Sequence, residues 1–161
     1  MNFLQNFPKK SVLLNQQRSQ VFDLDGHIHT PYSFSAFDDI PQIFRMAEEE
    51  GIKAVGINDF IVTDGYKEFH DHAVSSGVFP LFNIEFMGLL KGEQAVGIRV
   101  NDPSNPGRTY FSGKGLDFPN IPDPETMKLL TRVKEESNRQ TEQMIQKLDQ
   151  FVDSINAPFG F

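Results

Sequence analysis

Three successive β-prone segments each end in side chains of the kinds that bind metal ions. His27 and His29 follow the first segment, Asp59 the second and Glu85 the third. In an extended chain, residues i and i+2 point to the same face, so both imidazoles of a His-x-His pair can reach one cation. On an exposed loop the same two histidines would carry no function. The carboxylates at matching strand ends favour the metal site.

The elements that must position these side chains alternate along the chain. Apolar runs at 21–24, 54–57 and 79–82 predict three short strands, and the segments between them have helical spacing of apolar residues. Strand–helix–strand order with short connections is typical of parallel βα units. In such folds the functional side chains lie at the carboxyl ends of the strands, because the loops there meet at one edge of the sheet. We therefore expect an α/β fold.

Capping residues give the expected limits of the two helices. The first should begin at Asp38 or Asp39 and end at Gly51. The second should run from about Gly65 to Ser76, with Thr63 or Asp64 as its N-cap and Gly77 as its stop. These four cap candidates and two glycines follow from residue type alone.

Beyond Glu85 the pattern is less regular. Residues 94–100 predict a further strand, and 101–123 are rich in proline and glycine and predict an irregular loop. A long helix is expected from Asp123 or Pro124 to Ile155, closed by Pro158. Its middle part lacks apolar residues, which indicates a solvated face.

Composition excludes several classes of protein. The 161 residues carry a formal charge of −7 with no cysteine, so disulfides, iron–sulfur clusters and thiol nucleophiles are excluded. Any metal must be held by histidine and carboxylate, which suits zinc, manganese or iron. The acidic balance disfavours nucleic acid, although a local basic pocket stays open. No apolar run predicts a membrane span or a secretory signal, so we expect a cytoplasmic protein with a polar N-terminal lead-in at 1–20.

Three motifs together resemble one known family. Residues 25–33 read Asp-Gly-His-Ile-His-Thr-Pro-Tyr-Ser, which resembles the first motif of the PHP (polymerase and histidinol phosphatase) superfamily. Residues 56–60 and 64–66, Gly-Ile-Asn-Asp-Phe and Asp-Gly-Tyr, resemble its second motif. Residues 83–85, Asn-Ile-Glu, stand where the family has Gly-x-Glu. The resemblance covers about residues 21–86.

Membership would imply a distorted seven-stranded βα barrel that holds two or three divalent metal ions and hydrolyses phosphate esters. By this resemblance His27, His29 and Glu85 are metal ligands, with Glu85 bridging two ions. Asp59 is a ligand or a carboxylate that supports one, and Asp25 orients an imidazole. The resemblance implies a small phosphorylated substrate and no catalytic group beyond metal-bound water. It assigns no substrate-binding residue.

Two departures from the family pattern keep other functions open. Phe60 stands where the second motif has histidine, Asn58 stands where it has threonine, and no histidine follows His72. The chain could therefore be a catalytically impaired PHP-like module that binds or scaffolds. A metal amidohydrolase, which also begins with His-x-His, is a third reading. It would need a later lysine or histidine pair and a closing aspartate, which the chain lacks.

Length bears on how much of the barrel is present. A closed parallel barrel needs at least about 200 residues. Residues 21–161 therefore predict only the N-terminal part of such a domain, and we favour a longer parent protein. If the chain is complete, its uncovered strand edges and helix faces predict self-association.

Two further segments mimic functional motifs. His70 and His72 repeat the His-x-His spacing, but in a predicted helix they lie about 200° apart and cannot share one cation. Residues 107–114 resemble a phosphate-binding loop with the wrong glycine spacing. Arg108 and Lys114 could still contact an anionic substrate.

Overall fold

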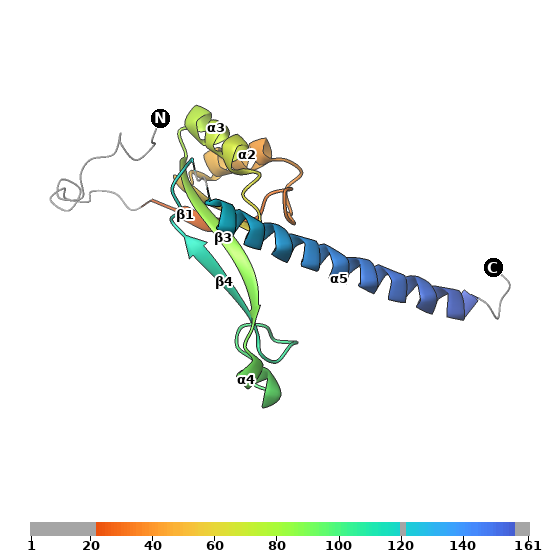
Figure 1. The fold of residues 1–161 in the computed structure, drawn as a ribbon. Coiled ribbons are helices and arrows are strands. Elements are labelled where there is room, and N and C mark those ends of the chain that lie inside the picture. Colours follow the sequence, from red (N-terminus) through yellow and green to blue (C-terminus); the bar gives the residue numbers. More distant parts are fainter. Residues whose placement is uncertain (1–21, 120–121, 157–161) are drawn as a thin grey trace. The chain divides into compact units, whose positions relative to one another are not determined.

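The computed structural model describes residues 22–119 and 122–156, which belong to two compact units that divide at Asn120 (Figure 1). Among the residues described, those of the first unit form a four-stranded sheet and three helices, and those of the second form one long helix. Within the first unit, the sheet carries His27 and Glu85. The expected lead-in at 1–20 and the stop at Pro158 lie outside the described residues.

The strands lie in sequence order and curl into part of a barrel (Figure 1). β1 (Leu24–Ile28), β2 (Ala54–Phe60) and β3 (Phe79–Leu89) are parallel, and β4 (Arg108–Lys114) pairs antiparallel with β3. The parallel βα arrangement expected from the sequence is confirmed. The fold is mixed α/β, and the curled sheet forms half of a barrel, in agreement with the expected partial barrel.

Two helices cover one face of the sheet (Figure 1). α2 (Ile40–Glu50) begins at Asp39, whose Oδ1 accepts a hydrogen bond from the Gln42 amide at 2.7 Å. It ends at Gly51, whose φ of 74° is the left-handed conformation that favours glycine. Both limits were expected from the sequence.

α3 (Tyr66–Ser76) also has its expected end but a different cap. It ends at Gly77, whose φ is 73°. Its N-cap is Gly65, which has no side chain to accept a hydrogen bond, so the expectation of Thr63 or Asp64 was wrong. The first turn is closed by backbone instead, since the Tyr66 amide donates to the Thr63 carbonyl at 3.1 Å.

The hydrophobic core lies between the sheet and these two helices. Alternate residues of β2 enter it, with Val55 and Ile57 almost fully buried, and on β3 Phe82 points the same way. The remaining core members come from β1, the two helices and the residue before β3: Ile28, Ile40, Ile43, Phe44, Ala47, Tyr66, Phe69, Ala73 and Val78. Asn58 and Phe60, on the opposite phase of β2, therefore face away from the helices. This opposite face holds the candidate site.

The chain after Glu85 differs from the sequence expectation. Residues 94–100 form no strand; α4 (Lys91–Ala95) is a short helix, followed by turns. The expected loop at 101–123 instead contains β4. The reason is tertiary: β3 continues to Leu89, and its exposed backbone pairs with Arg108–Lys114 over seven residue pairs. Within β4, Thr109, Tyr110 and Phe111 are residue types that favour strands, although the wider segment is rich in glycine and proline.

The second unit consists of α5 (Pro124–Asn156), 33 residues long, as the sequence predicts. Asp123 caps it, because its side chain accepts hydrogen bonds from the Thr126 amide at 3.0 Å and hydroxyl at 2.6 Å. In the described part of the chain, neither this helix nor any other combines the length and apolar character needed to cross a membrane.

Candidate metal centre

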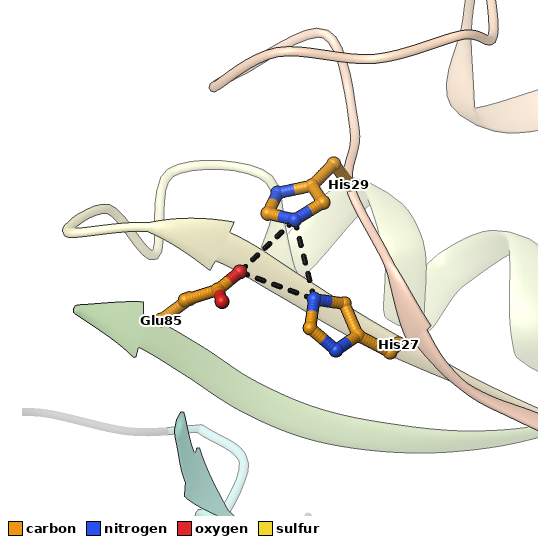
Figure 2. Close-up of side chains that lie close together, drawn as sticks. All are labelled: His27, His29 and Glu85. Atoms are coloured by element: carbon orange, nitrogen blue, oxygen red, sulfur yellow. Dashed lines mark hydrogen bonds and ion pairs between the residues drawn. The ribbon is translucent and has the colours of Figure 1, made fainter. Parts of the chain in front are cut away.

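Two imidazoles and one carboxylate converge on a single point at the face of the sheet away from the helices (Figure 2). The Oε2 atom of Glu85 lies 3.1 Å from His27 Nε2 and 3.0 Å from His29 Nε2. The two Nε2 atoms are 3.3 Å apart. Among the described residues this is the one group of three or more histidines and carboxylates arranged to hold a metal ion.

Strand periodicity explains why these three side chains meet. His27 in β1 and His29 just beyond it lie on either side of Ile28, which is buried in the core, so both imidazoles face the other way. Glu85 in β3 is in register with Phe60 of β2 and shares its face. The sequence placed all three just past their strands. His27 and Glu85 in fact lie inside them, because both strands extend further than their apolar runs.

Burial differs across the group and gives it an open side. The side chain of Glu85 is 8% exposed and that of His29 is 15% exposed, whereas that of His27 is 49% exposed. A carboxylate buried to this extent needs a compensating positive charge or several hydrogen bonds. A ligand can reach the group from the side of His27.

Asp59 lies on the opposite phase of β2 and does not join this group. It is fully buried and accepts hydrogen bonds from the Thr30 amide at 2.6 Å, the Thr30 hydroxyl at 2.5 Å and the Ser33 hydroxyl at 2.8 Å. Ser33 Oγ in turn lies 3.3 Å from His29 Nδ1. The carboxylate therefore acts on the site through Ser33, and it holds the loop that carries His29.

This chain of contacts assigns the tautomer of His29. The Asp59 carboxylate only accepts, so the Ser33 hydroxyl donates its proton there and can only accept from His29 Nδ1–H. The Nε2 atom of a neutral His29 then carries a lone pair directed at Glu85. Burial lowers the pKa of His29 below 6.5, although Glu85 beside it acts in the opposite sense. The neutral form is therefore favoured at pH 7.

A lone pair that faces a carboxylate oxygen at 3.0 Å is repelled unless a cation lies between them. The donor separations fit a metal ion: ligands about 2.1 Å from a cation are about 3.0 Å apart at right angles and about 3.4 Å apart in a tetrahedron. The observed separations of 3.0–3.3 Å fall in this range. Imidazole and carboxylate together suit zinc, manganese or iron. The residues present therefore fit a divalent ion.

Asn58, Ser112 and Lys114 also border the group, and the sequence analysis did not place the first two there. Asn58 Nδ2 lies 2.9 Å from His27 Nε2, 3.2 Å from Glu85 Oε2 and 3.1 Å from Ser112 Oγ. Lys114 Nζ donates to Asn58 Oδ1 at 3.2 Å, which fixes the orientation of the amide. Period-two alternation about Ile57 could have indicated Asn58. Ser112 and Lys114 carry no such signal, because β4 was not expected.

Asp25 contacts the site through backbone and not through an imidazole. Its Oδ1 accepts a hydrogen bond from the His27 amide at 3.1 Å, and the residue is exposed. This contact holds the backbone of β1 at a point where its pairing with β2 is irregular, between Asp25 and Ile28. The orientation of an imidazole by Asp25, implied by the family resemblance, has no corresponding contact here.

Aromatic rings cover one side of His29. The ring of Phe60 stacks on the imidazole with centroids 5.1 Å apart, and Phe34 lies 4.6 Å from it. Tyr110 meets the edge of Phe60 at 6.0 Å. Ile61 follows with a φ of 62°, a conformation unfavourable for a β-branched residue, and its amide donates to the Glu85 carbonyl at 3.0 Å. Phe60 thus supplies packing, and no ligand atom, at this position.

Comparisons with known proteins agree with this geometry. The model of the PHP domain family matches residues 25–155. A search of curated proteins found no match. One similar solved structure is a protein from Bifidobacterium adolescentis assigned as a metal-dependent phosphoesterase, with 16% identity, a TM-score of 0.62 and 81% of this chain covered. Another is an amidohydrolase from Chromobacterium violaceum with bound sulfate and no metal, with 18% identity, a TM-score of 0.59 and 80% of this chain covered.

At these identities the two structures show a shared fold. The matched regions make up 40% and 39% of their lengths, so this chain spans well under half of either protein. The family model, in contrast, covers most of the chain, including both histidines and Glu85. The chain belongs to the PHP domain family.

Proposed function

We propose that this chain contributes a metal site to a phosphoesterase that hydrolyses phosphate esters. The observation that carries the proposal is the convergence of His27, His29 and Glu85, with the lone pair of His29 directed at a buried carboxylate. A divalent cation resolves that repulsion, and zinc, manganese and iron match the donors. Family membership and the fold shared with a protein assigned as a metal-dependent phosphoesterase support this reaction class.

Each residue around the group has a distinct role in the proposed metal site. His27, His29 and Glu85 would hold the ion, while Asp59 keeps His29 in the correct tautomer through Ser33. A bound divalent ion supplies Lewis acidity, which activates water and stabilises charge that develops on phosphorus. Phe60 and Phe34 exclude water from one side of His29. The half-exposed His27 leaves the opposite side open to a small phosphorylated substrate.

A second candidate is a PHP-like module that binds without hydrolysis. It is favoured by Phe60, which fills with an aromatic ring the position where the family motif has histidine. An amidohydrolase reaction is supported by the fold that this chain shares with the amidohydrolase from Chromobacterium violaceum. That protein was solved with sulfate, a tetrahedral oxyanion like phosphate, which suits the phosphoesterase proposal equally well.

Metal content of the protein purified without chelator tests the proposal, with Glu85→Gln as the decisive variant. We expect at least one equivalent of zinc, manganese or iron in the wild-type chain and little in Glu85→Gln, because the amide lacks the negative charge. Glu48→Gln, which changes an exposed glutamate on α2, is the matched control.

Two outcomes would count against the proposal at different levels. Equal metal content in wild type and Glu85→Gln would mean that the group does not bind the ion. Stoichiometric metal that depends on Glu85, without hydrolysis of phosphate monoester or diester probes, would favour the binding module for this chain.

A further inference from the structure

Lys114 is a cation on the same face of the sheet as the metal-ligand group, and the proposed function leaves it without a role. In the antiparallel pairing of β4 with β3, Lys114 is opposite Asn83 and Ser112 is opposite Glu85. Paired residues of neighbouring strands share a face, so Lys114 and Ser112 both lie on the face that carries Glu85. The residue is exposed, at the last position of β4.

The hydrogen bonds of Lys114 fix its ammonium group but do not saturate it. Nζ donates to the Gly26 carbonyl at 3.1 Å and to Asn58 Oδ1 at 3.2 Å. An ammonium has three N–H donors, so one remains. Within the described ranges, 22–119 and 122–156, no carboxylate forms an ion pair with Lys114. This includes Asp25, which directly precedes Gly26, the residue whose carbonyl accepts from Lys114.

A single amide connects this ammonium to the metal ligands. Asn58 accepts from Lys114 through Oδ1 and lies 2.9 Å from His27 Nε2 and 3.2 Å from Glu85 Oε2 through Nδ2. The Gly26 carbonyl, the other acceptor, belongs to the residue directly before His27 in β1. Lys114 is therefore held at the rim of the group by the same strand that carries His27.

Charge indicates what the remaining donor can bind. A divalent ion balanced by the single carboxylate of Glu85 retains one positive charge, and Lys114 adds a second. A phosphate monoester carries a charge between about −1.5 and −2 near neutral pH and presents several acceptor oxygens. An acidic chain, with a formal charge of −7, otherwise repels such a ligand.

We propose that Lys114 forms an oxyanion-binding site beside the triad and donates its remaining N–H to a non-bridging oxygen of a phosphoryl group. This inference rests on the proposed function, because it names the group of the substrate that the site holds. Lys114 acts by binding, and no covalent step is assigned to it. The hydrogen bond to Asn58 holds the Lys114 side chain in place before the anion binds. Binding therefore costs little additional side-chain entropy.

The test is calorimetric titration with inorganic phosphate of the full 161-residue chain, both metal-free and loaded with Mn²⁺. The variants are Lys114→Gln, which removes the charge, and Lys114→Arg, which keeps it. Lys67→Gln is the matched control, because Lys67 is an exposed lysine on α3 paired with Asp71. Metal affinity is measured for each variant in parallel.

We expect Lys114→Gln to weaken phosphate binding about tenfold, the usual effect of losing one charged hydrogen bond. Lys114→Arg and Lys67→Gln should stay close to the wild-type value, and metal affinity should not fall in Lys114→Gln. This combination separates anion binding from a purely structural role for the lysine.

Three results would overturn the proposal. One is equal phosphate affinity in wild type and Lys114→Gln, and another is no phosphate binding by either form of the wild type. The third is a loss in Lys114→Gln that follows a parallel loss of metal affinity, since Lys114 would then only position Asn58. If the wild type takes up no metal, the proposed function fails, while the titration of the metal-free chain still decides the role of Lys114.

Discussion

The chain contains two His-x-His segments with identical spacing, and the fold gives them different surroundings. His27 and His29 lie on β1 and just beyond it, their Nε2 atoms are 3.3 Å apart, and Glu85 contacts both. His70 and His72 lie on α3, where positions i and i+2 point about 200° apart. The imidazole of His70 stacks on Phe118 with centroids 4.6 Å apart, and that of His72 lies 6.2 Å from the ring of Phe44.

The spacing of two candidate metal ligands therefore indicates a metal site only in combination with the secondary structure that carries it. Strand alternation places both imidazoles of the first pair on one face, and a carboxylate from β3 reaches the same point. On the helix the second pair is divided between two directions, and each ring packs against an aromatic side chain. The same three-residue pattern thus forms a candidate metal centre in one region and a packing surface in the other.

The greatest loss of metal binding is expected when the histidines of the strand pair are removed. We expect His27→Ala combined with His29→Ala to abolish metal uptake, with a loss greater than the roughly 100-fold that outer partners of a ligand can cost. His70→Ala combined with His72→Ala should retain the metal content of the wild type. Elemental analysis of both double variants after purification without chelator measures the difference.

Circular dichroism of the two double variants controls for folding. Equal loss of metal in both double variants would contradict a specific role for the strand pair, because the loss would then follow from a general disturbance of the fold. Retention of metal by the variant that lacks His27 and His29 would also contradict it.

The strand–helix order and the triad could be predicted because local signals determine them. Asp39 and Gly51 limit α2 through capping and a left-handed glycine, both readable from residue type. The triad follows from His-x-His in a strand and a carboxylate in the third strand. Its members were placed by type and order alone, and the sheet register then brought them within 3.3 Å.

The features that the sequence did not predict depend on pairing between strands or on which face of the sheet a strand residue points to. β4 forms because the long β3 offers a free edge. Thr109, Tyr110 and Phe111 favour a strand, but nothing in residues 108–114 identifies β3 as its partner. Asp59 shows the problem of phase: it follows Asn58 directly, so one of the two must face the helices and the other the site. The apolar positions Val55 and Ile57 fix that phase, and they place Asn58, not Asp59, beside the triad.

A smaller effect is expected from Asp59, a buried carboxylate that reaches His29 through Ser33. Asp59→Asn should weaken metal binding by about 10- to 100-fold, since the amide no longer accepts from both Thr30 and Ser33 in the way that sets the His29 tautomer. Metal affinity is measured by competition with a chelator under conditions where the variant is folded. Asp71→Asn, which changes an exposed carboxylate beside His70, is the control and should bind metal like the wild type.

The smallest effect concerns α3, whose contribution we expect to be to stability and not to metal binding. Tyr66, at its start, is buried, and its hydroxyl donates to the Asn83 carbonyl at 2.9 Å. Tyr66→Phe should lower the free energy of unfolding by about 1 kcal/mol at pH 7 and leave metal content unchanged. Urea unfolding monitored by circular dichroism provides the measurement.

The pH dependence of that difference tests the cause. Burial raises the pKa of Tyr66 well above its ordinary value of 10.0, and the charge of Asp59 adds to the increase. Above about pH 10 the unfolded chain loses the phenolic proton and the folded chain keeps it, so the wild type loses stability as pH rises, by up to about 1.4 kcal/mol per pH unit. Tyr66→Phe has no such proton, so its disadvantage should shrink above pH 10. If the free energies of unfolding of wild type and Tyr66→Phe differ by the same amount from pH 7 to pH 11, the hydroxyl is not held in the core. Only the apolar residues of α3 would then stabilise its packing.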